Sequence, residues 1–166
     1  MVGGKWSVLI ACQENLSEEE KGWLQERVKP DNCVFRVNGQ VYRREWRVHG
    51  ELHREDGPAC VTYYNNGRVQ YEEWRVNGKL HREDGPACVA YHENGRVHYK
   101  EWRVNGRMHR EGGPAYIMRY NDGQVHRREW RVNGKRHRED GPACVSYYEN
   151  GQVLHRQLWV AGMQLW

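Results

Sequence analysis

Short stretches of alternating hydrophobic and polar residues make up most of the chain, and each stretch ends at a turn-forming pair. Between residues 59 and 82, such runs cover residues 59–64, 68–76 and 79–82, separated by Asn65-Asn66-Gly67 and Asn77-Gly78. Alternation with a period of two is typical of half-buried strands, and Asn-Gly steps supply the positive φ of tight hairpins. The pattern predicts a meander of antiparallel β-hairpins.

One irregularity in the alternation predicts a break inside the longest of these strands. Val69 and Tyr71 share one face of a regular strand, whereas Trp74 and Val76 fall on the other. A β-bulge or a sharp bend near Glu72-Glu73 would return Trp74 to the face of Val69. We expect this bend in every unit, because the same conflict recurs at Val41/Trp46, Val97/Trp102 and Val125/Trp130.

The hairpins recur as a tandem repeat with a period of 28 residues, which is the main signal in the sequence. Four tryptophans keep this spacing, and each opens a Trp-Arg-Val-x-Gly pentad: Trp46, Trp74, Trp102 and Trp130. The same spacing holds for four histidines: His53, His81, His109 and His137. It also holds for four Gly-Pro steps: Gly57 and Pro58, Gly85 and Pro86, Gly113 and Pro114, Gly141 and Pro142. Aligning the flanks pairs Pro30 with Pro58 and extends the repetitive body from about Pro30 to Gly162.

The repeat predicts corners and a tryptophan ladder. Each Gly-Pro step should form a corner between units, because Pro lacks an N–H donor and pushes its predecessor away from the α region. A unit of this size cannot bury its apolar face alone, so neighbouring units must stack their aromatic side chains. A Trp that buries ~200 Å² contributes at most roughly 5 kcal/mol by area. The Trp row is thus the expected basis of stability.

The two ends of the chain differ from the middle, as the ends of repeat arrays do. Residues 5–12 predict a strand, and Ser17-Glu18-Glu19-Glu20 has the spacing of a capping box at the start of a short helix over residues 18–28. Residues 158–166 predict an apolar hairpin that closes the array or pairs with a second chain. The candidate residues for self-association are Trp159, Leu165 and Trp166.

These elements define an all-β fold class. We expect an N-terminal strand and helix that cap one end over residues 1–29, and hairpin repeats over residues 30–157. The repeats should form an elongated, twisted and largely single antiparallel sheet, which a capping hairpin over residues 158–166 completes.

Composition places this sheet in an intracellular, reducing compartment. No stretch approaches the roughly 18 apolar residues of a membrane helix, and the first residues lack the pattern of a signal peptide. The five cysteines are an odd number with no Cys-x-x-Cys pair, which argues against both a disulfide framework and a zinc site. We expect reduced thiols, no transmembrane segment and no cofactor.

Charge favours a polyanion partner only weakly, because the 26 basic and 22 acidic residues are interleaved along the chain. Arginine beside aromatic residues is also a feature of nucleic-acid surfaces. A glutamate two residues before each Arg of the Trp-Arg-Val pentads should neutralise that row, as in Glu45 and Arg47. The most basic part is the third-to-fourth unit, where an anion or partner contact is first expected: Arg127, Arg128, Arg131, Lys135, Arg136 and Arg138.

No constellation in the sequence predicts catalysis or metal binding. The segment His53-Arg54-Glu55-Asp56 superficially resembles a kinase catalytic loop, but the other kinase motifs are missing and a structural turn is the better interpretation. The registered histidines would lie ~10 or ~19 Å apart across two or four strands, which exceeds the reach of one ion. Cys60 and Cys88 face the same limit and are interpreted as small buried hydrophobes.

The turns carry a family resemblance. Tyr-x-x-Asn-Gly turns at residues 63–67, 91–95 and 147–151 alternate with Trp-Arg-Val-Asn-Gly turns. This combination resembles the MORN-repeat family, especially its variants with two Asn-Gly-type turns per unit. The His-Arg-Glu-Asp-Gly-Pro-Ala segments at residues 53–59, 81–87 and 137–143 are similar to repeats in proteins of giant DNA viruses of amoebae.

The resemblance covers most of the chain and implies a twisted, single-layer sheet that binds proteins or lipids and often dimerises. It brings no catalytic residues. It also implies a viral structural or accessory role, in the cytoplasm or nucleus of the host or in the virion. The longer period and the His-Arg-Glu-Asp-Gly-Pro corner depart from ordinary MORN units, so a lipid partner is not expected.

The sequence thus predicts a non-enzymatic β-repeat scaffold or protein-interaction module whose partner is another protein or its own copy, as a homodimer for example. The alternative is a nucleic-acid-associating protein that uses the Arg- and Trp-rich faces of its repeats. Salt dependence separates the two, because phosphate contacts weaken steeply as salt is added.

Overall fold

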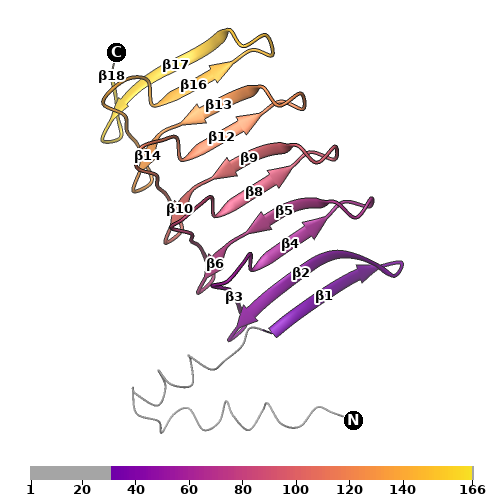
Figure 1. Ribbon diagram of the computed structural model, residues 1–166. Coiled ribbons are helices and arrows are strands. Elements are labelled where there is room, and N and C mark those ends of the chain that lie inside the picture. The colour runs from indigo at the N-terminus through magenta and orange to yellow at the C-terminus, as the bar shows by residue number, and fades with distance from the viewer. Residues whose placement is uncertain (1–30, 166) are drawn as a thin grey trace, which may run out of the picture.

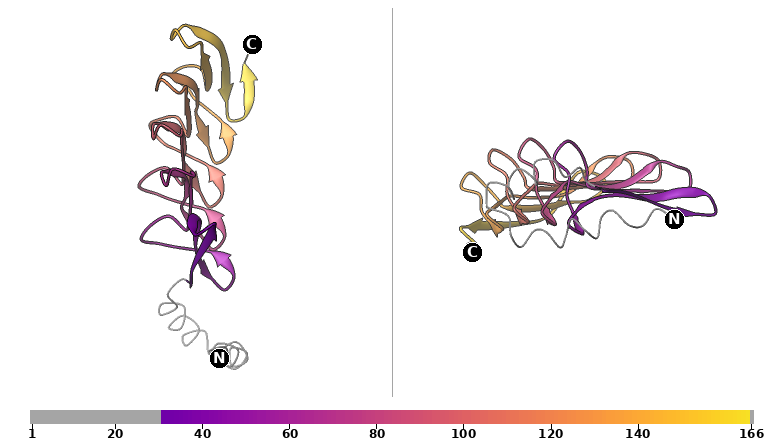
Figure 2. Two further views of the ribbon diagram at one scale, coloured as in Figure 1. Left: turned by 90° about the vertical axis from the view of Figure 1, so that its right-hand side faces the viewer. Right: turned by 90° about the horizontal axis from the view of Figure 1, so that it is seen from below.

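The computed structural model describes residues 31–165 and confirms an all-β repeat fold. The expected strand over residues 5–12 and the expected helix over residues 18–28 lie outside the described residues. One long antiparallel sheet runs through the molecule and gives it an elongated shape (Figure 1). Seen from its edge the sheet is thin, and loops project from it on one side (Figure 2).

Eleven strands follow one another across the long sheet in chain order: β1 (Asp31–Val37), β2 (Gln40–Val48), β4 (Cys60–Tyr63), β5 (Val69–Glu73), β8 (Cys88–Tyr91), β9 (Val97–Glu101), β12 (Tyr116–Arg119), β13 (Val125–Glu129), β16 (Cys144–Tyr147), β17 (Val153–Val160) and β18 (Met163–Leu165). A twelfth strand, β3 (Glu51–Leu52), pairs with the end of β2. Three short hairpins lie beside the sheet: β6 (Arg75–Val76) with β7 (Lys79–Leu80), β10 (Arg103–Val104) with β11 (Arg107–Met108), and β14 (Arg131–Val132) with β15 (Lys135–Arg136).

Successive units are joined by one recurring strand ladder. Within a unit, Cys60 of β4 lies opposite Glu73 of β5. Between units, Glu73 lies opposite Cys88 of β8. The joints β9 to β12 and β13 to β16 use the equivalent residues. Every unit therefore continues the sheet of the unit before it.

The predicted irregularity is present in each unit, but the structure divides it into two features. The first is a register shift that leaves Gln70 as an extra residue, because Tyr63 pairs with Val69 while Thr62 pairs with Tyr71. This bulge lies before the predicted position at Glu72-Glu73, so the predicted position was wrong. The second feature is a change of partner at Trp74, where β5 ends and the chain continues into the β6–β7 hairpin.

The pairing defines two faces of the sheet, because directly opposed residues in antiparallel strands share a face. The cysteine face carries Cys60, Tyr71, Glu73 and their equivalents. The valine face carries Val61, Glu72 and their equivalents. The bulge places Val69 opposite Tyr63 and hence on the valine face. Regular alternation in β2 puts Trp46 on the same face as Arg44, which lies opposite Val61, so the predicted return of the tryptophan to the valine-row face is observed.

The core is thin and follows the strand after each Gly-Pro corner. In β4, Cys60 is 2% exposed and Val61 is 5% exposed, although their side chains point to opposite faces. The equivalent strands, together with the alanine that precedes each of them, supply the other buried hydrophobic residues of the described chain: Ala59, Ala87, Cys88, Val89, Ala90, Ala115, Ala143, Cys144 and Val145. Small side chains suffice there because the surrounding sheet residues are long and cover them.

The first unit is built differently from the repeats that follow. Its β1–β2 hairpin turns at Asn38 and Gly39, whose φ values are 50° and 80°. Cys33 lies opposite Glu45, the place that Cys60 takes on the other side of β2. The shorter turn moves β1 by one residue against the 28-residue spacing, so the alignment of Pro30 with Pro58 does not hold for the paired strands.

Candidate interaction site

Each tryptophan of the repeat is covered by an arginine from the corner of its own unit. The guanidinium carbon of Arg54 lies 4.3 Å from the ring centre of Trp46. The three later units repeat this stacking at 4.3, 3.9 and 4.0 Å: Arg82 on Trp74, Arg110 on Trp102 and Arg138 on Trp130. Among the described residues, the aromatic ring pairs join tyrosines, histidines and Phe35, and none joins two of these tryptophans. The rings thus occupy equivalent places without forming an aromatic stack of their own.

The glycine of each corner leaves room for this arginine. A Cβ atom added at Gly57 would lie 2.8 Å from the guanidinium carbon of Arg54. The arginine also pairs with the aspartate of the corner, since Nε of Arg54 donates to Asp56 at 2.7 Å. In the third unit, where Gly112 replaces the aspartate, Arg110 donates to the carbonyl oxygen of Pro114 instead. The corner is a packed structural element, and sequence analysis missed its contact with Trp.

The predicted neutralised arginine row is confirmed on the cysteine face. Nε of Arg75 donates to Glu73 at 2.7 Å, and one further hydrogen bond runs from Arg75 to the carbonyl oxygen of Gly78 at 2.6 Å. The equivalent pairs are Arg47 with Glu45, Arg103 with Glu101 and Arg131 with Glu129. These arginines hold the sheet to its side hairpins and do not form an open phosphate track.

The six basic residues singled out in the third-to-fourth unit do not form one cluster. Three arginines converge on the buried carboxylate of Glu129. Guanidinium nitrogens of Arg127, Arg131 and Arg136 lie 2.5, 2.9 and 3.6 Å from its oxygens. Burial works to raise the pKa of Glu129, but the hydrogen bond from Arg131 and the charges of the three arginines outweigh it and lower that pKa. Arg128 lies on the valine face, Arg138 stacks on Trp130, and Lys135 is exposed on β15.

The histidine row links neighbouring hairpins. Nδ1 of His53 accepts a hydrogen bond from the backbone N–H of Asn77 at 3.2 Å. His81, His109 and His137 accept in the same way from Asn105, Asn133 and Ala161. Each donor residue has φ near 50° at the head of a tight turn. Within residues 31–165, no group of three His, Cys, Asp or Glu side chains is placed to hold a metal ion.

The cysteines of the array are buried, and one of them packs against tyrosines. Cys60, Cys88 and Cys144 are free and buried. Sγ of Cys88 lies 2.9 Å from the hydroxyl of Tyr71, which donates to Glu73. Burial is the main cause that raises the pKa of the Cys88 thiol to about 11. A thiol held protonated in this way is a poor nucleophile, which agrees with the interpretation of these residues as buried hydrophobes.

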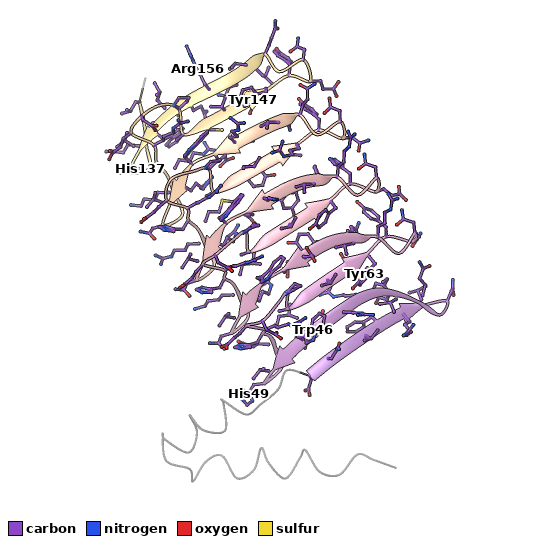
Figure 3. All side chains as sticks on the ribbon, in the orientation of Figure 1. Trp46, His49, Tyr63, His137, Tyr147 and Arg156 are labelled. Atoms are coloured by element: carbon purple, nitrogen blue, oxygen red, sulfur yellow. The ribbon has the colours of Figure 1, made fainter. Side chains whose placement is uncertain are left out.

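The valine face carries a mixed row of charges beside a row of tyrosines. Four basic side chains and one acidic side chain alternate with three valines and Ile117 in the middle of the sheet: Arg44, Glu72, Lys100, Arg128 and Arg156. Arg44 lies over the ring of Tyr63 at 5.9 Å, and Arg128 lies over that of Tyr147 at 5.7 Å. Figure 3 labels Tyr63 and Tyr147 near the two ends of this row.

One edge of the sheet is open in the last unit. Residues His155, Arg156 and Gln157 of β17 occupy the places of Tyr71, Glu72 and Glu73, which pair with the next unit through β8. Within residues 31–165, no strand pairs with them on the outer side, because β18 pairs only with Leu158, Trp159 and Val160. Beside this edge, Val153 is 53% and Leu154 is 47% exposed. Arg156 is at the top of the sheet in Figure 3.

Two of the three candidate residues for self-association, Trp159 and Leu165, lie beside this open edge. Trp159 is half-buried, and the guanidinium of Arg136 lies 5.3 Å from its ring centre. Leu165 is exposed on β18, whereas Trp166 lies outside the described residues. A shallow hollow at the turns of the last two units is lined by Tyr120, Tyr148, Glu149, Asn150 and Gln152, and these turn residues include neither histidine nor cysteine.

Comparison with models of known protein families found no match, and no curated protein matched the chain. In the described part of the chain, no helix has the length and apolar character needed to cross a membrane. The surfaces of the sheet are therefore the basis for a functional proposal.

Proposed function

We propose that this protein is a non-enzymatic β-repeat scaffold that binds other protein chains at the open edge of its sheet. The observation that carries the proposal is that, among residues 31–165, no strand pairs with the outer side of residues 155–157. The equivalent three positions pair with a neighbouring strand in every preceding unit. An unpaired strand edge presents backbone donors and acceptors that an added strand satisfies. The resemblance to MORN repeats supports a protein-binding role.

Two features favour binding over catalysis. The charged side chains with the closest contacts are used in structural pairs repeated from unit to unit, such as Arg75 with Glu73 and Arg82 with Asp84. The buried thiols have raised pKa values because of burial. A reactive group needs a special environment, whereas these groups sit in environments that recur along the array.

The test uses the backbone N–H of Arg156. In the interior joint, the N–H of Trp74 donates outward to the carbonyl oxygen of Ala87. Residues two apart in a strand point the same way, so the outward donors include Glu72 and its equivalent Arg156. Arg156→Pro removes this donor and the charge, whereas the matched control Arg156→Gln removes only the charge.

The two variants and the wild type serve as baits for crosslinking in a lysate of the native cells. We expect chains that crosslink to the wild type and to Arg156→Gln, with crosslinks near β17, and at least a tenfold loss with Arg156→Pro. Equal capture by both variants would show that the edge is not the binding site.

A second candidate function is association with single-stranded nucleic acid on the valine face. It rests on the row of Arg44, Lys100, Arg128 and Arg156 beside Tyr63 and Tyr147, which combines basic and aromatic groups as single-strand binding surfaces do. The tryptophans are not available for this role on the side that their arginines cover.

Fluorescence anisotropy with labelled oligonucleotides of DNA and RNA tests the second function. Binding should weaken steeply between 50 and 200 mM salt. Lys100→Glu should weaken it, whereas Arg103→Gln on the opposite face should not, provided that circular dichroism confirms folding. No anisotropy change at low salt would exclude this function.

A further inference from the structure

We propose that the partner at the open edge is a second copy of this chain, which adds its β1 to β17 in the register of the interior joints. This inference rests on the proposed edge-binding function and names the chain that binds. It follows from comparing the two ends of the long sheet. Within residues 31–165, β1 lacks a neighbour on its outer side, and residues 155–157 of β17 lack one on theirs.

The four interior joints specify one pairing scheme. In each, three residues of the strand before a side hairpin pair with three residues of the next strand, as Tyr71, Glu72 and Glu73 pair with Ala90, Val89 and Cys88. The joints of β2 with β4, of β9 with β12 and of β13 with β16 use the equivalent residues. A fifth joint between copies would place Gln157, Arg156 and His155 opposite Cys33, Val34 and Phe35.

The residues that would meet in this joint are compatible with those of the interior. Arg156 opposite Val34 repeats the pairing of Arg128 with Val145 and of Lys100 with Ile117. His155 opposite Phe35 would place two rings together, where the interior joints pair Tyr99 with Met118. Phe35 is 38% exposed and Val34 is 43% exposed on β1, and this pairing would cover both.

The side hairpin at the end of the array leaves room for the added strand. The first unit provides the precedent, because β2 pairs with β3 through Arg47 and Val48 and with β4 through residues 43–45. Both partners thus lie on the same side of β2, one after the other. β17 pairs with β18 through residues 158–160 only, so its residues 155–157 are free for a strand that takes the place of β4.

A joint between two different edges does not close on itself. Each added copy brings a new free β17, so the assembly grows head to tail into an extended sheet. This growth distinguishes the proposal from a dimer made by pairing β17 with β17 or β1 with β1, where the same edge of both copies is used and assembly stops at two.

Two blocking variants test the direction of assembly. Val34 takes the place of Val61, so Val34→Pro removes the backbone N–H of β1 that points away from the sheet. Arg156→Pro removes the equivalent outward N–H of β17. Proline is tolerated at an edge position whose N–H points away from the sheet. Analytical ultracentrifugation should show wild-type species larger than a dimer that grow with concentration, and monomers for each variant alone.

An equimolar mixture of the two variants should form a dimer that does not grow, because each variant keeps the edge that the other lacks. Dimers of Val34→Pro alone would indicate pairing of β17 with β17, and dimers of Arg156→Pro alone would indicate pairing of β1 with β1. Either outcome, or a wild type that stays monomeric at all concentrations, would overturn the proposal. Val34→Leu and Arg156→Gln are the matched controls that keep the backbone donors.

A disulfide between copies tests the register without blocking an edge. The N–H of Trp74 donates across the joint to the carbonyl oxygen of Ala87, so the backbone of Glu73 points away from β8, and the neighbouring pair of Glu73 and Cys88 belongs to the closely spaced class. In the proposed joint this pair is Gln157 with Cys33. Cys144 lies opposite Gln157 within the same chain and would compete for the new thiol. With Cys12 and Cys144 changed to Ser, Gln157→Cys should give a ladder of covalent oligomers under mild oxidation with copper phenanthroline.

The ladder should disappear when Cys33 is changed to Ser in the same protein, and disulfide dimers that persist would indicate β17 pairing with itself. Failure of the proposal is distinguishable from failure of the edge-binding function. If the wild type is monomeric but its β17 edge still captures another protein in an Arg156→Pro-sensitive way, only the identity of the partner changes.

Discussion

At the scale of single residues, the pairing of each tryptophan with an arginine is the main contact that sequence periodicity could not supply. The two residues are eight positions apart in every unit, as in Trp102 and Arg110. The arginine reaches the ring only after the chain has passed through the side hairpin and begun the corner. The third unit isolates this contact, because Gly112 removes the aspartate that the other corner arginines bind.

We predict that Trp102→Ala lowers the free energy of unfolding by about 3–5 kcal/mol, because a large half-buried ring is lost from the middle of the array. A double-mutant cycle with Trp102→Leu and Arg110→Met should give a coupling energy of about 0.5–2 kcal/mol for the stacked pair. Urea unfolding measures both quantities. An unchanged midpoint for Trp102→Ala, or strictly additive effects in the cycle, would contradict this account of the row.

Glu129 gives a second prediction at the residue scale. Its carboxylate holds three arginines, so Glu129→Gln should cost about 1–3 kcal/mol at neutral pH by leaving charged donors without their acceptor. The pKa of Glu129 lies below its ordinary value of 4.5 in the folded protein. The stabilisation is therefore present above pH 4.5 and is lost as the pH falls through the lower, folded-state pKa.

Urea unfolding of the wild type and of Glu129→Gln between pH 3 and pH 7 checks the sign. The wild type should lose more stability on acidification than the variant, because only the wild type binds an additional proton at this site on unfolding. Parallel profiles for the two proteins would show that Glu129 does not contribute to the acid sensitivity. Glu149→Gln, on an exposed turn, is the matched control.

At the scale of elements, the alternation of hydrophobic and polar residues predicts that a strand contains an extra residue, but it does not predict where that residue lies. The sequence requires one extra residue between Val69 and Trp74, and any position in that segment satisfies the requirement. The structure places the bulge at Gln70 because Tyr71, Glu72 and Glu73 are all needed for the ladder with β8. That ladder joins residues from different units, so local patterning could not locate the bulge.

The alternation of side chains between the two faces of a strand also explains which parts of the candidate site were predictable. Glutamate and arginine two residues apart lie on one face of a strand, so their pairing followed from the sequence. Arg127 and Arg128 are adjacent and must point to opposite faces, so alternation could have separated the predicted basic cluster in advance. The convergence of Arg136 on Glu129 depends on how the β14–β15 hairpin folds back, and no local signal encodes it.

The histidine links give a prediction about how hairpins are held together. His109→Leu should cost about 1 kcal/mol, because the N–H of Asn133 loses its acceptor at the head of the next turn. Glu111→Ala is the matched control, since its side chain is 88% exposed and 4.0 Å from the other ring nitrogen of His109. Thermal unfolding should separate the two variants, and equal effects would assign the role to the ion pair instead of the hydrogen bond.

At the scale of the whole molecule, equivalent joints should make units interchangeable. Deleting residues 60–87 removes one period and joins Ala59 to Cys88, which restores the native order Gly-Pro-Ala-Cys-Val at the seam. Cys88 then takes the place of Cys60 opposite Glu45. The shortened chain should fold with the same circular dichroism per residue and unfold cooperatively, at lower stability, since one unit and one interface are lost.

Deleting residues 60–86 is the control that separates register from length. It leaves one residue too many before Cys88, and a shift of one residue moves every following side chain in the strand to the opposite face. In the strands after the seam, the cysteines would then lie on the valine face and the valines on the cysteine face. This protein should lose its cooperative transition although it is one residue longer than the first variant. If both deletions behaved alike, the units would not be joined by the fixed ladder on which the scaffold and its head-to-tail growth depend.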